Sequence, residues 1–392
     1  AYIQDQVEFS GLIANVGLRL DAYNFGADVP VYPFDVFYPA ENEGFTGGIG
    51  IPAWEDSKTF VRLSPRAGLS FPISDKTVFR VQYGHFTSMP LIVRALDNQT
   101  NHGWGMIGNP NLEPQLSVNY EIGIQQNLWN THQLDIVTYY NDLKNQVSAV
   151  SMETTAGSIK KQGDYYGTYT TYLNNAYGSS QGVEFSFSNR RADRWRYRLT
   201  YTLSQVKTGY HGYYIIREDM TPELKQKYTY SASDYTSGED RTHRFNGSLS
   251  YAFPAHSGPQ IAGIHPLENT RIGLIYRVSS GLAYYWQPAY VADANIESNR
   301  RYPLESNTDL QIEKNVRFSG GLSLVVSMRV SNLFNNQQLT PVYSDELSRW
   351  VLRSATYMDA DTDPGRDVRL YNYYQTFKNV PREIYLNLGF SF

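Results

Sequence analysis

Residues 116–128 constrain the fold of this chain more than any other stretch. One face of the stretch is apolar and carries Leu116, Val118, Tyr120, Ile122, Ile124 and Leu128. The other face carries Ser117, Asn119, Glu121, Gly123 and Gln125. An alternating run of about thirteen residues is about twice the length of an ordinary globular strand, whereas a tilted strand crosses a bilayer in about nine to eleven residues. The pattern therefore predicts a strand of a transmembrane β-barrel.

Composition agrees with this prediction. Aromatic residues make up 15% of the chain, which is typical of the aromatic girdles of such barrels. The mean hydropathy is only −0.46, because half of each barrel strand faces a polar lumen. A net charge of −4 gives no basic surface for nucleic acid, and the absence of cysteine excludes disulfides and thiol chemistry.

The same alternation recurs along the chain, most clearly at residues 12–22. In residues 195–203 the energy decides which face is which: an arginine in contact with lipid near the midplane costs roughly 2–4 kcal/mol. Arg196 and Arg198 are therefore expected to face the lumen, with Trp195, Tyr197 and Leu199 facing lipid. We also expect one short helix after Thr221, because Thr221-Pro222-Glu223 has the form of a helix N-terminus.

Residues 108–123 carry a family resemblance. The sequence GNPNLEPQLSVNYEIG is similar to the middle of the barrel of TonB-dependent outer-membrane transporters, with Gln115 where glutamate is usual. Further similar segments are SPRAGLSFPI at 64–73, QGVEFS at 181–186, DRTHRFNGSLSY at 240–251 and VSNLFN at 330–335. Together they most resemble the Oar-like branch of Bacteroidetes-type bacteria, whose members carry a carboxypeptidase-regulatory domain.

The predicted fold class is all-β, a transmembrane antiparallel β-barrel. Counting segments gives about thirteen strands, while bacterial barrels have an even number and plugged transporters close at about 22. The resemblance implies that residues 1–392 form the C-terminal part of such a barrel, and we expect the first strands, the plug and the signal peptide before Ala1. The long connections 25–56, 88–114, 209–239 and 335–379 are expected to be extracellular, and the short turns periplasmic.

The resemblance also implies function and partners. It implies a protein of the Gram-negative outer membrane that is not an enzyme and imports a bulky ligand such as a siderophore, an oligosaccharide or a peptide. Expected partners are outer-membrane lipid, lipopolysaccharide, TonB with its inner-membrane complex, and a surface lipoprotein. The terminal Phe392, in phase with Ile384 and Phe390, resembles the assembly signal of bacterial outer-membrane barrels.

Candidate ligand-binding residues lie in the predicted loops and lumen. They are His85, Trp104, Tyr213, Tyr214, Arg196 and Arg198. Aromatic side chains offer stacking surfaces for sugars, peptides or chelates. Packing of the loops against one another explains the same aromatic residues, and a solvated histidine explains His85.

An acidic run near the C-terminus is the one candidate metal site. It contains Asp359, Asp361, Asp363 and Asp367 around a Pro-Gly turn, which resembles the start of a calcium loop. Leu370 stands where such a loop has its distal glutamate, so a solvated acidic loop is the alternative. No other cofactor is expected.

Two short segments match the residue spacing of enzyme motifs but lack the structural context that those motifs need. Residues 103–108 match GxGxxG, but Asn109-Pro110 follows where a nucleotide-binding helix is needed. Residues 178–182 match GxSxG, but a predicted strand follows instead of a helix. Two alternatives to transport remain: a non-transporting outer-membrane barrel that acts as an adhesin or scaffold subunit, and a soluble β-rich binding protein or outer-membrane hydrolase.

Overall fold

The structure is a computed structural model of the 392-residue chain. It describes residues 1–31, 33–34, 54–97, 106–153, 168–189, 194–230, 234–261, 265–284, 300–301, 304–318, 321–336 and 381–391.

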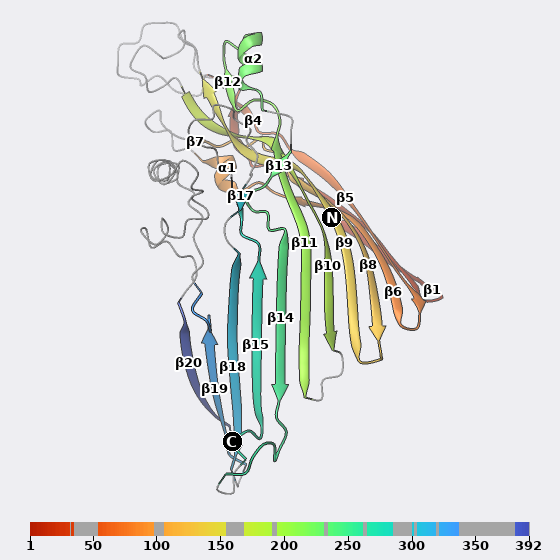
Figure 1. Ribbon diagram of the computed structural model, residues 1–392. Coiled ribbons are helices and arrows are strands. Elements are labelled where there is room, and N and C mark those ends of the chain that lie inside the picture. Colours follow the sequence, from red (N-terminus) through yellow and green to blue (C-terminus); the bar gives the residue numbers. More distant parts are fainter. Residues whose placement is uncertain are drawn as a thin grey trace.

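One antiparallel sheet forms most of the molecule (Figure 1). Its main path has thirteen strands, which are, in the order in which they pair, β1 (Tyr2–Phe9), β2 (Leu12–Tyr23), β5 (Phe60–Ser74), β6 (Thr77–Ser88), β8 (Gln115–Leu128), β9 (His132–Glu153), β10 (Thr168–Asn189), β11 (Trp195–Tyr210), β14 (His243–Ala252), β15 (Thr270–Ser279), β18 (Glu305–Arg317), β19 (Ser323–Ser331) and β20 (Glu383–Ser391). The all-β expectation and the strand number are confirmed.

The path curves like part of a barrel wall but does not close on itself. Within the described residues, β1 pairs only with β2 and β20 only with β19. Hairpins such as Ser10-Gly11 join neighbouring strands at one end of the sheet, which we call the turn end. The other end carries the long connections and is called the loop end (Figure 1).

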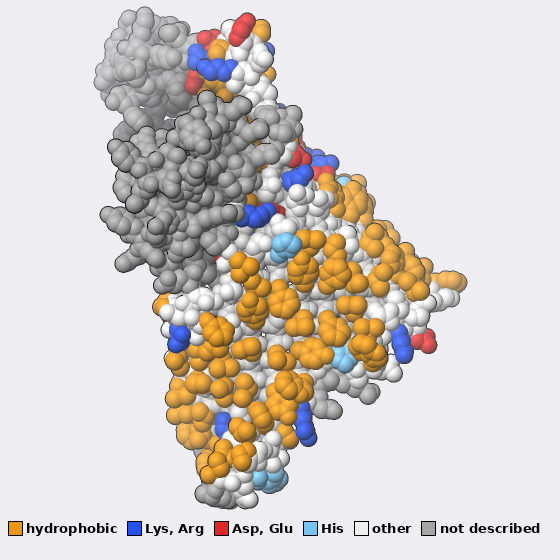
Figure 2. Space-filling model, in the orientation of Figure 1, with side chains coloured by type: hydrophobic (Ala, Val, Ile, Leu, Met, Phe, Trp, Pro, Cys, Tyr) orange, Lys and Arg blue, Asp and Glu red, His pale blue; other side chains and the backbone are white. Residues whose placement is uncertain are grey.

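The two faces of the sheet differ as the alternation predicts. The antiparallel register aligns an apolar row across six strands: Tyr197, Leu249, Leu274, Leu310, Val330 and Ile384. Figure 2 shows apolar side chains covering the strands on this outer face, while charged side chains lie mainly toward its margins, at the loop end and near the turn end. Such a band matches the lipid-facing surface of a β-barrel, and the opposite face is the concave one.

Two strands extend well beyond this apolar band. Strands β9 and β10 each have 22 residues, about twice what a bilayer crossing needs. Their extensions pair in parallel with the short strands β12 (Ile215–Arg217) and β7 (Met106–Ile107). Met152 and Tyr169 form the buried core of this small sheet at the loop end.

The remaining elements are short. Strands β3 (Asp28–Pro30) and β4 (Trp54–Asp56) form one hairpin, β16 (Ala283–Tyr284) and β17 (Arg300–Arg301) another, and β13 (Tyr235–Thr236) pairs with β11. The helices are α1 (Ile92–Leu96) and α2 (Pro222–Tyr228).

Helix α2 confirms the predicted helix after Thr221. The Thr221 hydroxyl accepts a hydrogen bond from the backbone N–H of Leu224, and Pro222 occupies the first helical position. In the part of the chain that the structure describes, no helix is long and apolar enough to span a membrane.

Candidate functional site

The turn at residues 108–114 is a junction between distant strands. Leu112 is fully buried, and its carbonyl accepts a hydrogen bond from the Tyr23 hydroxyl at 2.8 Å. The side chain of Asn109 donates to the carbonyl of Tyr172 on β10 at 2.9 Å. A turn that carries this many cross-strand bonds fixes the loop end of β2 relative to that of β10.

Glu113 extends this junction to two more strands. Its carboxylate forms an ion pair with Arg62 on β5 and accepts a hydrogen bond of 3.0 Å from the side chain of Asn145 on β9. Its backbone N–H donates to Asn174 on β10 at 2.8 Å. The motif noted in the sequence is therefore the point where four strands are tied together.

Helix α1 packs on this turn through a close backbone contact. A Cβ atom on Gly108 would lie 2.5 Å from the carbonyl oxygen of Ala95, so the contact requires glycine. The backbone N–H of Gly108 donates to the carbonyl of Asp97 at 2.7 Å. Beside this contact, Leu91, Ile92 and Val93 are 61%, 67% and 57% exposed.

The concave face of the C-terminal strands is lined by arginines, which we call the arginine wall. Its members are Arg196, Arg198, Arg244, Arg271 and Arg329. The register places Arg196 in one row with Ser250, Gly273, Gln311 and Arg329. None of the five guanidinium groups forms a hydrogen bond or ion pair with a residue that the structure describes.

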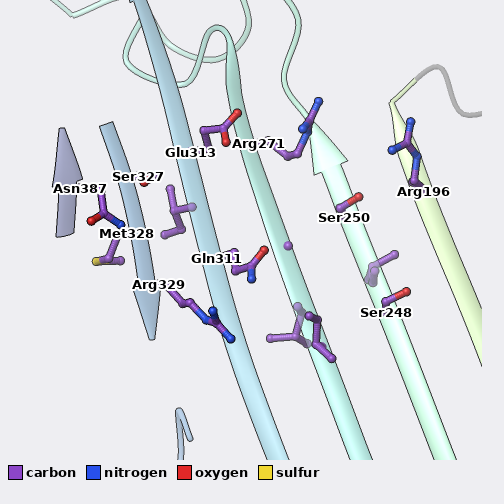
Figure 3. Close-up of a pocket in the computed structure, with 15 residues that line it drawn as sticks. Arg196, Ser248, Ser250, Arg271, Gln311, Glu313, Ser327, Met328, Arg329 and Asn387 are labelled. Atoms are coloured by element: carbon purple, nitrogen blue, oxygen red, sulfur yellow. The ribbon is translucent and has the colours of Figure 1, made fainter. Parts of the chain in front are cut away.

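A hollow of about 440 Å³ lies over the middle of the arginine wall (Figure 3). Its charged lining residues are Arg196, Arg271, Arg329 and one acid, Glu313. Its neutral polar lining residues are Ser248, Ser250, Gln311, Ser327 and Asn387. The rest of the lining is apolar or glycine: Leu249, Gly273, Leu274, Ile275, Ile312 and Met328. The hollow therefore has an excess of positive charge and many neutral hydrogen-bonding groups.

The concave face of the N-terminal strands has compensated charges instead. The pairs are Arg19 with Asp21 at 2.8 Å, Arg80 with Glu121 at 3.8 Å, and Arg62 with Glu113. Arg66 lies over the ring of Phe86, 4.4 Å from its centroid. The rest of this face is mostly glycine, asparagine, glutamine and serine.

A buried ion pair joins the loop end of β11 to the β16–β17 hairpin. Asp240 has 0% exposure, and its carboxylate accepts from the backbone N–H of Val206 at 2.6 Å and from the guanidinium of Arg301. Beside it, Arg241 forms a 3.0 Å ion pair with Glu305 on β18. These bonds fix the strands above the arginine wall.

Tyrosine rings pack against one another near α2. The rings of Tyr210 and Tyr230 stack with centroids 4.9 Å apart, and Tyr214 meets Tyr230 edge to face at 5.4 Å. Burial raises the pKa of Tyr230 and of Tyr235 above the usual phenol value, and a hydrogen bond with Tyr210 adds to the rise in the pKa of Tyr235. These phenols stay neutral at physiological pH.

Comparison with known proteins identifies the family. Residues 1–333 match the family model described as TonB dependent receptor-like, beta-barrel. The chain belongs to this family. Its members are β-barrel proteins of the outer membrane of Gram-negative bacteria. No curated protein sequence matches the chain.

Solved structures of TonB-dependent receptors share the fold. The FrpB iron transporter from Neisseria meningitidis has a TM-score of 0.51 and 16% identity, over 86% of this chain and 40% of its own. The ferric-catecholate import receptor Fiu from E. coli K12 has a TM-score of 0.51 and 14% identity, over 99% and 44%. The Serratia marcescens hemophore receptor HasR, in complex with HasA and heme, has a TM-score of 0.53 and 17% identity, over 86% and 48%. The chain spans less than half the length of these receptors.

In this receptor barrel the predicted ligand-binding residues lie in three separate places. Arg196 and Arg198 lie on the concave face, as the sequence predicts. Tyr213 bridges Thr229 across the α2 connection, and Tyr214 donates from its hydroxyl to the carbonyl of Lys227 at 2.9 Å. The two tyrosines thus lie between β11 and α2, whereas Arg196 and Arg198 lie near the opposite end of β11.

His85 is in the third place, near the loop end of β6. Its Nε2 lies 2.6 Å from the Tyr83 hydroxyl. The register puts His85 opposite Val118, in phase with Tyr83 and Tyr120 on the apolar face of the sheet. Its proposed ligand role stays a prediction, with a hydrogen-bonded partner already beside it.

Several predicted residues lie outside the described residues. They are Trp104, Phe392 and the four aspartates of the calcium prediction, Asp359, Asp361, Asp363 and Asp367. Among the residues that are described, no group of three or more histidine, aspartate or glutamate side chains is placed to hold a metal ion. Residues 178–182 of the GxSxG match run straight through β10, so they form no nucleophile turn.

The sequence analysis missed Arg244, Arg271 and Arg329. A signal for them was present, because each lies in the polar phase of an alternating strand, as Arg196 does. The phase argument made for residues 195–203 applies equally to these strands. What the sequence does not show is which strands pair, and hence that the arginines form one surface.

Proposed function

We propose that this chain is part of a transporter that takes up a bulky ligand across the outer membrane by a TonB-dependent mechanism. The observation that carries the proposal is the curved antiparallel sheet, whose outer face is apolar and whose concave face is polar and charged. Such a wall separates lipid from an aqueous lumen. Membership of the TonB-dependent receptor family supports the mechanism.

The complete barrel needs more strands than these thirteen. Lipid contains no water to satisfy an exposed strand edge, so β1 and β20 need neighbours in the membrane. We propose that residues outside 1–392 supply these strands and the plug, and that TonB acts through that part. We also propose that the protein belongs to the Oar-like branch and that it transports rather than catalyses. Its proposed partners in the membrane are outer-membrane lipid, lipopolysaccharide and a surface lipoprotein.

The experiment compares what living cells remove from their medium. Three strains are grown: the parent, a strain that lacks this gene, and a strain that lacks TonB function. Mass spectrometry of the spent medium should find at least one compound that only the parent depletes. Complementation with the gene should restore the depletion. Equal depletion by all three strains, or depletion that needs this protein but not TonB, would contradict the proposed uptake.

A further inference from the structure

We propose that the arginine wall binds a small polyanion, a molecule with two or more carboxylate or phosphate groups. The inference rests on the proposed function, since it describes the cargo that the lumen admits. Its structural basis is the hollow of about 440 Å³ between Arg196, Arg271 and Arg329. This volume lies in the range of small-molecule sites, roughly 300–1,000 Å³.

Charge is the first argument. Each arginine keeps its positive charge at every physiological pH, because guanidinium does not deprotonate in proteins. Glu313 is the only acid that lines the hollow, against three arginines. Most other acids on these strands are engaged elsewhere: Asp309 pairs with Arg277 at 3.0 Å, and Glu305 pairs with Arg241 at 3.0 Å. Among the described residues, Glu313 is therefore the one acid that faces the three arginines of the hollow, opposite Arg271 in the register.

Geometry is the second argument. Arg196 and Arg329 stand in the same row of the sheet, separated by β14, β15 and β18. Four strand spacings of about 4.8 Å put them roughly 19 Å apart along the wall, and Arg271 lies between them. Three fixed charges at this spacing suit several separated anionic groups better than a single ion. Guanidinium also presents paired N–H donors that match carboxylate and phosphate oxygens.

The neutral lining residues support the same class of ligand. Ser248, Ser250, Gln311 and Asn387 offer hydroxyl and amide donors between the arginines. No aromatic side chain lines the hollow, so stacking contributes nothing there. Recognition would thus depend on charge and hydrogen bonds. It should weaken as salt rises, because these side chains are exposed.

Calorimetry with a defined probe tests the proposal. The native, full-length protein, purified in detergent, is titrated with tricarballylate, which carries three carboxylates. The triamide of the same acid serves as the uncharged control. We expect binding of the acid alone, and weaker binding at about 0.15 M salt than at about 0.01 M. If the wild type does not bind tricarballylate, the proposal is overturned. That result is expected if an acidic polypeptide surface fills the lumen.

Two variants and a matched control locate the binding. Replacing Arg196, Arg271 and Arg329 together by glutamine should weaken binding about tenfold or more, because charge-assisted contacts are lost. Replacing Arg62, Arg66 and Arg80 by glutamine removes the same charge from the N-terminal strands and should change affinity less than about threefold. Gln311→Arg adds a charge to the hollow and should tighten binding.

The outcomes separate this proposal from the proposed function. Equal affinity of the wild type and the Arg196, Arg271 and Arg329 variant overturns the polyanion proposal, as does a Gln311→Arg variant that binds no tighter. The heat-dependent shift of folded barrels on gels confirms that each variant is folded. Medium depletion that needs TonB, together with no polyanion binding, leaves uptake standing and removes only the polyanion. Polyanion binding without TonB-dependent depletion of the medium supports the polyanion site and contradicts the proposed uptake.

Discussion

The N-terminal and C-terminal strands form the same wall but treat charge differently. On the concave face of β2 to β8, the arginines are paired with acids or lie over a ring, as Arg80 with Glu121 and Arg66 with Phe86 show. On β11 to β19, five arginines have no acidic partner among the described residues. The acids of these strands pair mainly with other arginines, such as Arg277 and Arg241.

This difference shows that the alternation of apolar and polar residues and the choice of charged residues determine different properties of the wall. Alternation decides which face meets lipid, and it is equally regular in both halves of the sheet. The choice of polar residue decides what the lumen attracts. Glycine contributes to the neutral half: a Cβ on Gly123 would lie 2.6 Å from the Nε of Arg80, so the bare backbone lets this arginine lie flat beside Glu121. The C-terminal arginines have no such arrangement.

The largest expected effect comes from the buried pair above the arginine wall. Asp240→Ala leaves Arg301 without its carboxylate and the N–H of Val206 without its acceptor. Breaking a buried pair by removing one partner costs about 3–5 kcal/mol. The matched change Asp21→Ala removes an exposed pair with Arg19 and should cost only about 0–1 kcal/mol. Thermal unfolding of both variants in detergent measures the difference, and equal losses would show that burial does not distinguish the pairs.

A smaller effect is expected from one added acid in each half. Gln311→Glu places a carboxylate opposite Arg329 and should stabilise the protein by about 0.2–1 kcal/mol. Gln82→Glu places one opposite Glu121, and like charges directly opposite each other destabilise a sheet by a similar amount. Denaturant unfolding should therefore shift in opposite directions. Shifts of the same sign would mean that the two halves do not differ in charge.

The smallest expected effect concerns Arg66, the one described arginine on the concave face of β2 to β8 that has no acidic partner. Arg66→Gln removes the contact with the ring of Phe86, which is worth about 0.5–1 kcal/mol at an exposed site. Arg196→Gln removes no described contact and relieves repulsion within the arginine wall, so stability should stay constant or rise slightly. Differential scanning calorimetry of the two variants makes the comparison. A larger loss for Arg196→Gln would contradict it.

Much of the fold follows from the sequence. Alternation located the membrane strands, and the residues around Thr221 located α2. Alternation does not show that β9 continues to Glu153 or that β10 begins at Thr168, because the alternation breaks in these extensions. Asn145 has a positive φ of 55°, and the β9–β10 register shifts between Leu173 and Ala176, so the side-chain phase is lost there.

Other features depend on contacts that no local pattern shows. The segment that begins at Asp240 was noticed for its resemblance, but the partner that explains its burial, Arg301, is 61 residues further on. The parallel pairing of β7 and β12 involves two and three residues, too few for a periodic signal. The arginine wall is predictable only in part from the sequence. The alternation predicts that each arginine faces the lumen, but the strand pairing is needed to show that the arginines form one surface.

The most direct test of this account asks which face of the sheet meets water. Gln311 and Ile312 are neighbours on β18 and belong to opposite faces, in register with Arg329 and Met328. A spin label on a cysteine at position 311 should be quenched by a water-soluble nickel chelate, and one at position 312 by oxygen, which dissolves in lipid. The reverse result, or equal access at both positions, would contradict a membrane wall with the arginines in its lumen.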